Sequence, residues 1–97
     1  MLDIEFTEAA ENDLADAQDW YDGESQTLGD RFIVEVRHQL RRIGESHLQF
    51  PLVQRDARRA NLRDFPYGII FRIAGNTAYI VAIFHFSRNP GIWKKRV

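Results

Sequence analysis

The sequence predicts an α+β domain in which an N-terminal strand and a two-helix hairpin pack on a small antiparallel β-sheet, with a short C-terminal helical turn or tail. Three observations predict it. Two stretches in the first half of the chain repeat apolar residues at helical spacing, two apolar β-rich runs follow, and a proline ends the last run. With 97 residues, the chain has the length of one globular domain, which we expect to cover residues 1–97.

The first half of the sequence predicts a strand and two helices. "LDIEF" alternates apolar and polar residues, as a short strand does. Thr7 is suited to cap a helix that ends near Gly23, and a second helix is expected over residues 27–46. Together the two helices form a hairpin. The apolar stripes are Ala10, Leu14, Ala17 and Tyr21 on the first helix, and Phe32, Val36, Leu40 and Ile43 on the second.

The second half of the sequence predicts the sheet. "HLQFPLVQRD" is expected to be only a connecting segment held by Pro51, and "RRANLRDF" a short strand. "YGIIFRI" and "TAYIVAIFHF" predict two longer strands joined by the turn "AGN". After them Pro90 has no N–H to give to a strand ladder, so the chain is expected to leave the sheet near Asn89.

The pairing of the two long strands predicts which residues share a face. If Ile73 pairs with Ala78, an unbroken antiparallel ladder places Arg72 opposite Tyr79 and Pro66 opposite His85. The helices are then expected to cover Tyr67, Ile69, Phe71, Ile80, Ala82 and Phe84. The other face collects Ile70, Arg72, Tyr79, Val81, Ile83 and His85. This second face is too apolar to be bare. Its cover is expected to be either the chain's own tail, with Ile92 and Trp93, or a partner protein.

Composition excludes several function classes. The chain has no cysteine, so no disulfide, thiolate metal site or cysteine nucleophile is available, and the cytosol is the expected location. The N-terminus is acidic and no apolar run is long enough to span a membrane, so we expect neither export nor a membrane partner. Phosphate-loop, nucleophile-elbow and zinc motifs do not occur, so no cofactor and no metal are expected.

Charge divides the chain into two parts. Residues 1–30 contain ten Asp or Glu and no Lys or Arg, whereas residues 31–97 contain thirteen Lys or Arg against four Asp or Glu. One explanation is pairing between the helices, where Arg31, Arg37, Arg41 and Arg42 of the second would face the acids of the first. The other is an acidic partner, because eleven of the thirteen cations are arginine, which suits forked contacts with carboxylates and phosphates.

Only one set of residues suggests catalysis. His85 and Arg72 are expected on the same sheet face, with Arg59 or Arg63 beside them. A histidine among arginines can transfer a proton while the cations stabilise a phosphate. The alternative is structural: His85 as a strand-end residue with its hydrogen bond satisfied, and Arg72 paired with an acid. We favour the structural alternative.

The order of elements and several motifs resemble the RelE/ParE superfamily of toxins from type II toxin-antitoxin systems. The motifs are "DWYD", "LGDRF", "RRANLRDFPYGIIFRI" and "VAIFHFSRNPGIWKKR". The likeness spans nearly the whole chain and is strongest to the ParE branch, also called plasmid-stabilisation toxins. One departure is "ESHLQFP", where many members have a proline soon after the second helix.

The resemblance implies a cytoplasmic toxin that inhibits DNA gyrase and is neutralised by a cognate ParD-like antitoxin. In this leading hypothesis the protein binds without bond chemistry, has no catalytic residue and does not bind nucleic acid directly. Arg88, Lys94, Lys95 and Arg96 are expected to contact the target, and an antitoxin segment with apolar and acidic residues to contact Ile70, Arg72, Tyr79, Val81 and Ile83.

Two other hypotheses stay open. The resemblance to the RelE branch implies an alternative function, a metal-independent endoribonuclease that cleaves messenger RNA. In that hypothesis His85 moves the proton and Arg72 and Arg63 hold the phosphate. It is also compatible with an antitoxin-bound remnant without toxicity. In every case we expect Trp93 to be structural, and Lys94, Lys95 and Arg96 to remain in solvent.

Overall fold

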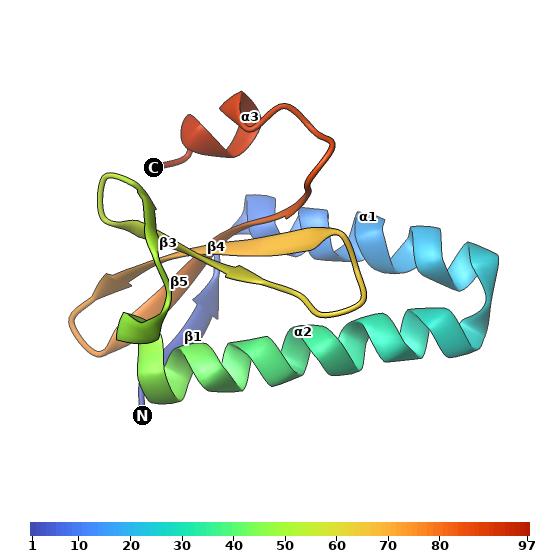
Figure 1. The fold of residues 1–97 in the computed structure, drawn as a ribbon, viewed down its shortest axis with the longest axis horizontal. Coiled ribbons are helices and arrows are strands. Elements are labelled where there is room, and N and C mark those ends of the chain that lie inside the picture. The colour runs from blue at the N-terminus through green and yellow to red at the C-terminus, as the bar shows by residue number, and fades with distance from the viewer.

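A five-stranded sheet in the order β1-β5-β4-β3-β2 forms the centre of the molecule (Figure 1). The computed structural model describes residues 1–97. The strands are β1 (Asp3–Phe6), β2 (Leu52–Gln54), β3 (Ala57–Asn61), β4 (Tyr67–Ala74) and β5 (Thr77–His85). The helices are α1 (Glu8–Glu24), α2 (Gln26–Ser46), the 3₁₀ turn η1 (His47–Gln49) and α3 (Gly91–Lys94). This arrangement confirms the predicted α+β class, with the hairpin α1–α2 before the main strands.

Local sequence signals set the hairpin. The Thr7 side chain accepts a hydrogen bond from Ala10 N at 3.2 Å and so caps α1. Ser25 caps α2 by accepting from Leu28 N at 3.0 Å. The helices approach closely at Gly29, where the Asp22 side chain occupies the space that a β-carbon would need. A larger residue at this crossing would displace the Asp22 side chain.

The helix-facing side of the sheet contains the main core. A cluster of 14 buried residues joins both helices to the sheet and includes Phe32, Val36, Ile43, Ile69 and Phe71. Near the turn that joins the two helices, aromatic rings meet at centroid distances of 5.0–6.0 Å, mostly edge to face. These rings belong to Tyr21, Phe32, Phe65 and Tyr67. The core explains the apolar stripes of the two helices.

Two local expectations about the sheet are wrong. The segment expected to be only a connection contains η1 and β2, which pairs antiparallel with β3. The sheet is mixed rather than purely antiparallel, because β1 runs parallel to β5, with Asp3 beside Thr77 and Phe6 beside Ile80. Both features depend on a neighbouring strand distant in sequence, so local sequence signals do not reveal them.

The predicted pairing of β4 and β5 is correct at the turn and wrong beyond it. Arg72 pairs with Tyr79 and Phe71 with Ile80, but Ile70 then pairs with Ala82. Val81 is the extra residue of a β-bulge, which moves all later residues of β5 to the opposite face. Ile83 therefore joins the helix-side core, while Ala82 and Phe84 lie on the other face. His85 pairs with Tyr67, not Pro66.

The second face of the sheet is covered by the chain's own tail. Figure 1 shows α3 on the side of the sheet opposite α2. Trp93 of α3 is only 3% exposed and forms a second buried cluster with Ala57, Ile70, Val81 and Ala82. Of the two expected covers, the tail is the one observed.

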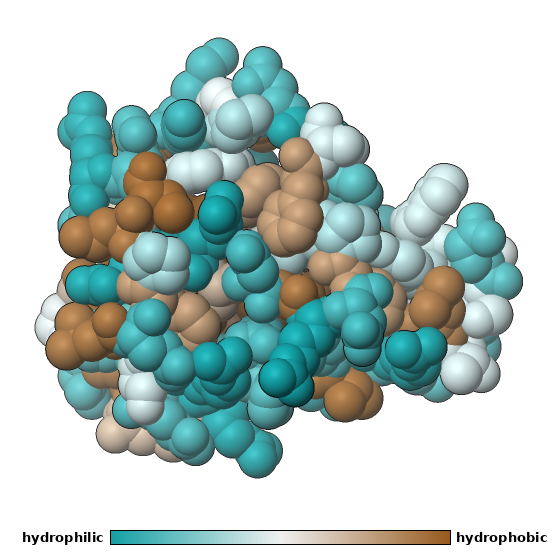
Figure 2. Space-filling view, viewed as in Figure 1, coloured by the Kyte–Doolittle hydropathy of each residue, from teal (hydrophilic) through white to brown (hydrophobic).

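The outer surface is largely polar, with isolated apolar side chains. Figure 2 shows hydrophilic surface over α2, with apolar side chains near η1 and β2, where Leu48 and Leu52 are exposed. No salt bridge joins the two long helices: the two in the structure link Arg72 to Asp56 and Arg96 to Asp13. The expected pairing of the α2 arginines with the acids of α1 is therefore wrong. No helix has the length and apolar character needed to cross a membrane.

Candidate functional site: a cleft beside the C-terminal segment

A cleft of about 300 Å³ lies between α1, the end of β5 and the C-terminal segment. The segment supplies one wall because the chain leaves the sheet after His85 and returns through α3. The cleft is lined by residues of both signs: acids from α1, and His85, Arg88 and Arg96 from the opposite side. The principal lining residues are Asp13, Asp16, Trp20, Tyr67, His85, Arg88, Ile92 and Arg96.

Two large apolar side chains stand exposed at this cleft. Trp20 of α1 is 64% exposed and Ile92 of α3 is 45% exposed. The expectation that Ile92 packs back with Trp93 is wrong, because neighbouring positions of a helix point in different directions. Exposed aromatic and aliphatic side chains beside charged ones are typical of surfaces that bind protein. The cleft therefore has the chemistry of a protein-binding site.

His85 is held by its own strand end. Its Nδ1 accepts a hydrogen bond from Ser87 N at 3.0 Å and lies 2.8 Å from Ser87 Oγ. Because a backbone N–H can only donate, Nδ1 is unprotonated in this arrangement and the neutral ring carries its proton on Nε2. The ring also meets Tyr67 edge to face at 5.1 Å between centroids. The unprotonated nitrogen of the ring is therefore occupied by Ser87.

Tyr67 also lacks the properties of a proton acceptor. Burial raises the pKa of its phenol above the usual value of 10.0, although the nearby Arg88 lowers it. Burial likewise raises the pKa of Tyr21, with a further contribution from Tyr67. Both phenols therefore remain neutral near pH 7.

Arg72 lies far from His85. Its guanidinium contacts Asp56 with Nε at 2.9 Å from Oδ1 and Nη2 at 3.2 Å from Oδ2. This hydrogen bond is the main cause of the lowered pKa of Asp56. His85 pairs with Tyr67 at the other end of β4. Tyr67 and Arg72 are five residue steps apart along the strand, which is roughly 17 Å.

The third residue of the expected nuclease site lies elsewhere again. Arg63 belongs to the loop after β3, and its backbone N–H donates to Glu35 of α2. Its side chain lines a shallow groove beside α2, together with His38. The expectation that His85, Arg72 and Arg63 share one sheet face is therefore wrong. For His85 the physical reason is the bulge at Val81, which moves this side chain to the helix-facing side of the sheet.

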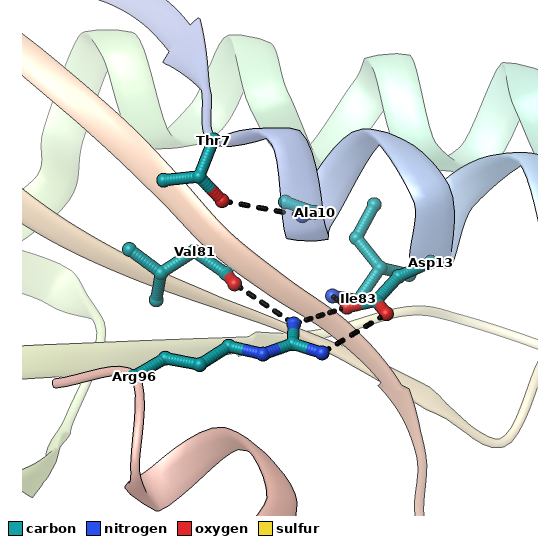
Figure 3. A network of polar contacts seen from close by, with 6 residues as sticks. All are labelled: Thr7, Ala10, Asp13, Val81, Ile83 and Arg96. Atoms are coloured by element: carbon teal, nitrogen blue, oxygen red, sulfur yellow. Dashed lines mark hydrogen bonds and ion pairs between the residues drawn. The ribbon is translucent and has the colours of Figure 1, made fainter.

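Arg96 is part of the fold rather than a free cation. Its Nη1 lies 2.6 Å from Asp13 Oδ2 and 3.0 Å from Val81 O, and its Nη2 lies 3.3 Å from Asp13 Oδ1 (Figure 3). Asp13 Oδ2 also accepts from Ile83 N at 3.0 Å. The pair thus satisfies backbone groups of β5 beside the bulge, where β1 no longer runs alongside. The expectation that Arg96 stays in solvent is wrong, whereas Lys94 and Lys95 are exposed.

Most of the residues expected to contact an antitoxin are covered. Ile70 and Val81 lie in the cluster with Trp93, and Ile83 lies in the helix-side core. The expectation that Ile70, Val81 and Ile83 share one face open to a partner is therefore wrong, for two reasons: the tail covers the face and the bulge removes Ile83 from it. Arg72 and Tyr79 retain surface, with Tyr79 41% exposed.

Sequence analysis missed the importance of Asp13 and Trp20. Asp13 is one of many acids on α1, and nothing in the local pattern separates it from its neighbours. Trp20 had a usable signal, because it lies outside the predicted apolar stripe of α1. No group of three or more His, Asp or Glu side chains lies close enough to hold a metal ion.

Comparison with known proteins identifies the family of the chain and supports its fold. Residues 4–90 match the family model described as the ParE toxin of the type II toxin-antitoxin system, parDE. The chain belongs to the ParE toxin family. Its match covers both long helices and all of the sheet except the first residue of β1, and it ends as the C-terminal segment begins its return.

A solved structure shares the fold of this ParE-family chain. The structure is described as the chromosomal ParDE TA system from P. aeruginosa, with a TM-score of 0.76 and 20% sequence identity. The alignment covers 88% of this chain and 96% of that one. No curated protein matches the chain.

Proposed function

We propose that this protein is a toxin that inhibits DNA gyrase by binding it in the cytoplasm, and that a ParD-like antitoxin neutralises it. Membership in the ParE family supports the toxin assignment. The observation that carries the binding mechanism is the dispersal of His85, Arg72 and Arg63: the first has its Nδ1 occupied, the second contacts Asp56, and the third lies beside α2. A phosphate-cleaving site needs such groups within hydrogen-bond reach of one substrate.

The proposed target contacts come from the C-terminal segment. Arg88, Lys94 and Lys95 are exposed and make no side-chain hydrogen bond within the chain. Exposed cations contribute little to stability but accelerate association with a partner of opposite charge. Arg96 is removed from this set because it contacts Asp13.

The proposed antitoxin contacts begin at the cleft beside α1. Trp20 and Ile92 supply apolar surface there, and Arg88 supplies a charge for an acidic residue. Arg72 and Tyr79 extend the contact along the exposed part of the second sheet face. The buried residues Ile70 and Val81 would contact a partner only if the tail moved.

Expression of the toxin without its antitoxin tests this function. We expect a DNA-damage response to precede any loss of messenger RNA, and purified toxin to inhibit gyrase supercoiling. The response should disappear when the ParD-like antitoxin is expressed with it. Early cleavage of messages without DNA damage would instead support the endoribonuclease hypothesis, and growth unaffected by high expression would support a non-toxic remnant.

A further inference from the structure

A second groove, on the tail-covered face of the sheet, has unusual chemistry. It has a volume of about 250 Å³ and lies between β3 and the segment that follows β5. Its lining consists of Arg59, Asn61, Phe84, Phe86, Arg88, Pro90 and Trp93. None of these residues carries a negative charge. The other main grooves of the surface each contain at least one carboxylate, such as Asp13, Asp30, Glu11 or Asp56.

Two buried hydrogen-bond donors in this lining lack a partner within the chain. They are Nε of Arg59 and Nε1 of Trp93. Leaving a buried donor unpaired costs on the order of 1–3 kcal/mol, so native proteins rarely do so without a reason. Trp93 is 3% exposed, and its indole N–H can only donate. Both groups therefore lack an acceptor within the chain, which an ordered water or a bound ligand supplies.

The other arginines of this region already have acceptors. Arg58 donates to Phe50 O at 2.6 Å, Arg72 contacts Asp56 and Arg96 contacts Asp13. No side-chain hydrogen bond joins Arg59 or Arg88 to another residue of the chain. The two guanidinium groups that line the groove are thus the ones left free for an external anion.

The size and walls of the groove favour one side chain of a larger polypeptide. Its volume is below the range of about 300–1,000 Å³ that is usual for whole small-molecule ligands. Phe84 and Phe86 form an aromatic wall over Gly68, where a β-carbon would come within 2.9 Å of the Phe84 ring, and Phe86 is 46% exposed. Such a wall suits an apolar residue next to the anion.

The charge of the chain favours a carboxylate over nucleic acid as the ligand of this groove. Binding a nucleic-acid backbone depends on many phosphate contacts along an extended basic surface. This chain has a net charge of −1, and only Arg59 and Arg88 are available in the groove. A single carboxylate matches two guanidinium groups and an indole N–H better than a run of phosphates does.

We propose that the groove formed by Arg59, Arg88 and Trp93 binds the side-chain carboxylate of an Asp or Glu in a partner polypeptide, with a neighbouring apolar residue on Phe86. Arg59 and Arg88 donate from their guanidinium groups, and the indole N–H of Trp93, which is shielded from solvent in the free chain, joins them once the anion is bound. The assignment does not depend on whether gyrase is the target of the toxin.

The two indole N–H signals of the full chain allow a direct test by ¹H–¹⁵N NMR. Trp93 reports on the groove, and Trp20 reports separately on the cleft beside α1. The probes are the capped tripeptides acetyl-Leu-Glu-Leu-amide and acetyl-Leu-Gln-Leu-amide, inorganic phosphate and a single-stranded oligouridylate. We expect the glutamyl peptide to move the Trp93 signal saturably while the glutaminyl peptide leaves it unchanged.

Substitutions test which residues donate hydrogen bonds to the carboxylate. Arg59→Gln and the exposed Arg88→Gln should each weaken binding of the glutamyl peptide about tenfold or more, the usual effect of losing a charge-assisted hydrogen bond. Arg63→Gln, an exposed arginine outside the groove, should leave it unchanged. Equal responses to both peptides, or none at Trp93, would overturn the proposal. A stronger response to the oligouridylate would assign the groove to nucleic acid, and one to phosphate alone would reduce it to a general anion site.

Discussion

The two faces of the sheet are stabilised in different ways. The helix-side face packs against 38 helical residues of α1 and α2 and contains a 14-residue buried cluster. The other face has a buried cluster of five, covered by the four-residue α3. A helix of that length does not hold itself together, so its position depends on Trp93 and on the contact between Arg96 and Asp13. The first face is therefore expected to set stability, and the second to carry the binding chemistry.

The largest expected effect is in the helix-side core. Phe32 is fully buried and touches the rings of Tyr21, Phe65 and Tyr67. Phe32→Ala should lower the free energy of unfolding by about 3–5 kcal/mol, because it removes the ring and leaves a cavity. Urea denaturation followed by circular dichroism measures this. If Phe32→Ala reduced the free energy of unfolding by less than Trp93→Ala on the other face does, the second face would contribute more to stability than the first.

Truncation of Trp93, which holds the tail on the sheet, should reduce stability less than Phe32→Ala does. Trp93→Ala should lower the free energy of unfolding by about 2–3 kcal/mol, near the lower end for a buried tryptophan, because the short α3 is free to relax into solvent. Thermal melts should show a decrease of several degrees. Hydrogen exchange should then increase at β5 near Val81 and remain slow in α2. Uniform acceleration throughout the chain would mean that the tail is as integral as the hairpin.

The three terminal cations should separate into two groups. Arg96→Ser should destabilise the fold by about 1–2 kcal/mol, because it leaves the half-buried Asp13 without its partner and Val81 O without a donor. The double variant Lys94→Ser, Lys95→Ser should change stability by less than about 0.5 kcal/mol. Chemical denaturation of both variants makes the comparison.

The same lysine pair should instead affect association. Surface plasmon resonance with gyrase should show slower binding for the double variant, with a weaker dependence on salt. Unchanged association and unchanged toxicity would reduce Lys94 and Lys95 to solvated residues. A large loss of stability in the double variant would mean that their packing is misjudged.

His85 should have a small effect on both stability and function. Its Nδ1 accepts from Ser87, and a glutamine oxygen at that position is able to accept the same N–H. His85→Gln should therefore keep toxicity and change the free energy of unfolding by no more than about 1 kcal/mol. Growth inhibition at matched expression tests this. Loss of toxicity in a folded variant that still binds antitoxin would favour the endoribonuclease.

The smallest effect concerns pH at the exposed end of the second face. The hydrogen bond from Arg72 lowers the pKa of Asp56 below its usual value of 3.8 in the folded chain. The unfolded chain therefore binds the proton first as pH falls, and the contribution of this pair is present above about pH 4 and lost in more acidic solution. Asp56→Asn should remove that part of the acid dependence and leave stability at pH 7 almost unchanged, since the pair is solvent-exposed. Melts between pH 2.5 and pH 7 compare the two proteins.

The sequence by itself determined the class of fold and the family, because both depend on local periodicity and motifs. The apolar spacing of α1 and α2, the caps at Thr7 and Ser25 and the turn at Gly75, whose φ is +58°, act within a few residues. The prediction that Trp93 is buried is also confirmed. It was possible from sequence because a large apolar side chain shortly after a strand-ending proline is expected to pack back on the sheet.

Only the tertiary structure decided which residues meet. The bulge at Val81 carries no local signal, yet it moved His85 and Ile83 to the helix side and separated His85 from Arg72. The contact between Asp13 and Arg96 joins residues 83 positions apart in the chain, and the groove of Arg59, Arg88 and Trp93 joins β3 to the tail. Such contacts depend on strand register and on the path of the returning chain, which local propensities leave undetermined because a one-residue shift inverts every later side chain.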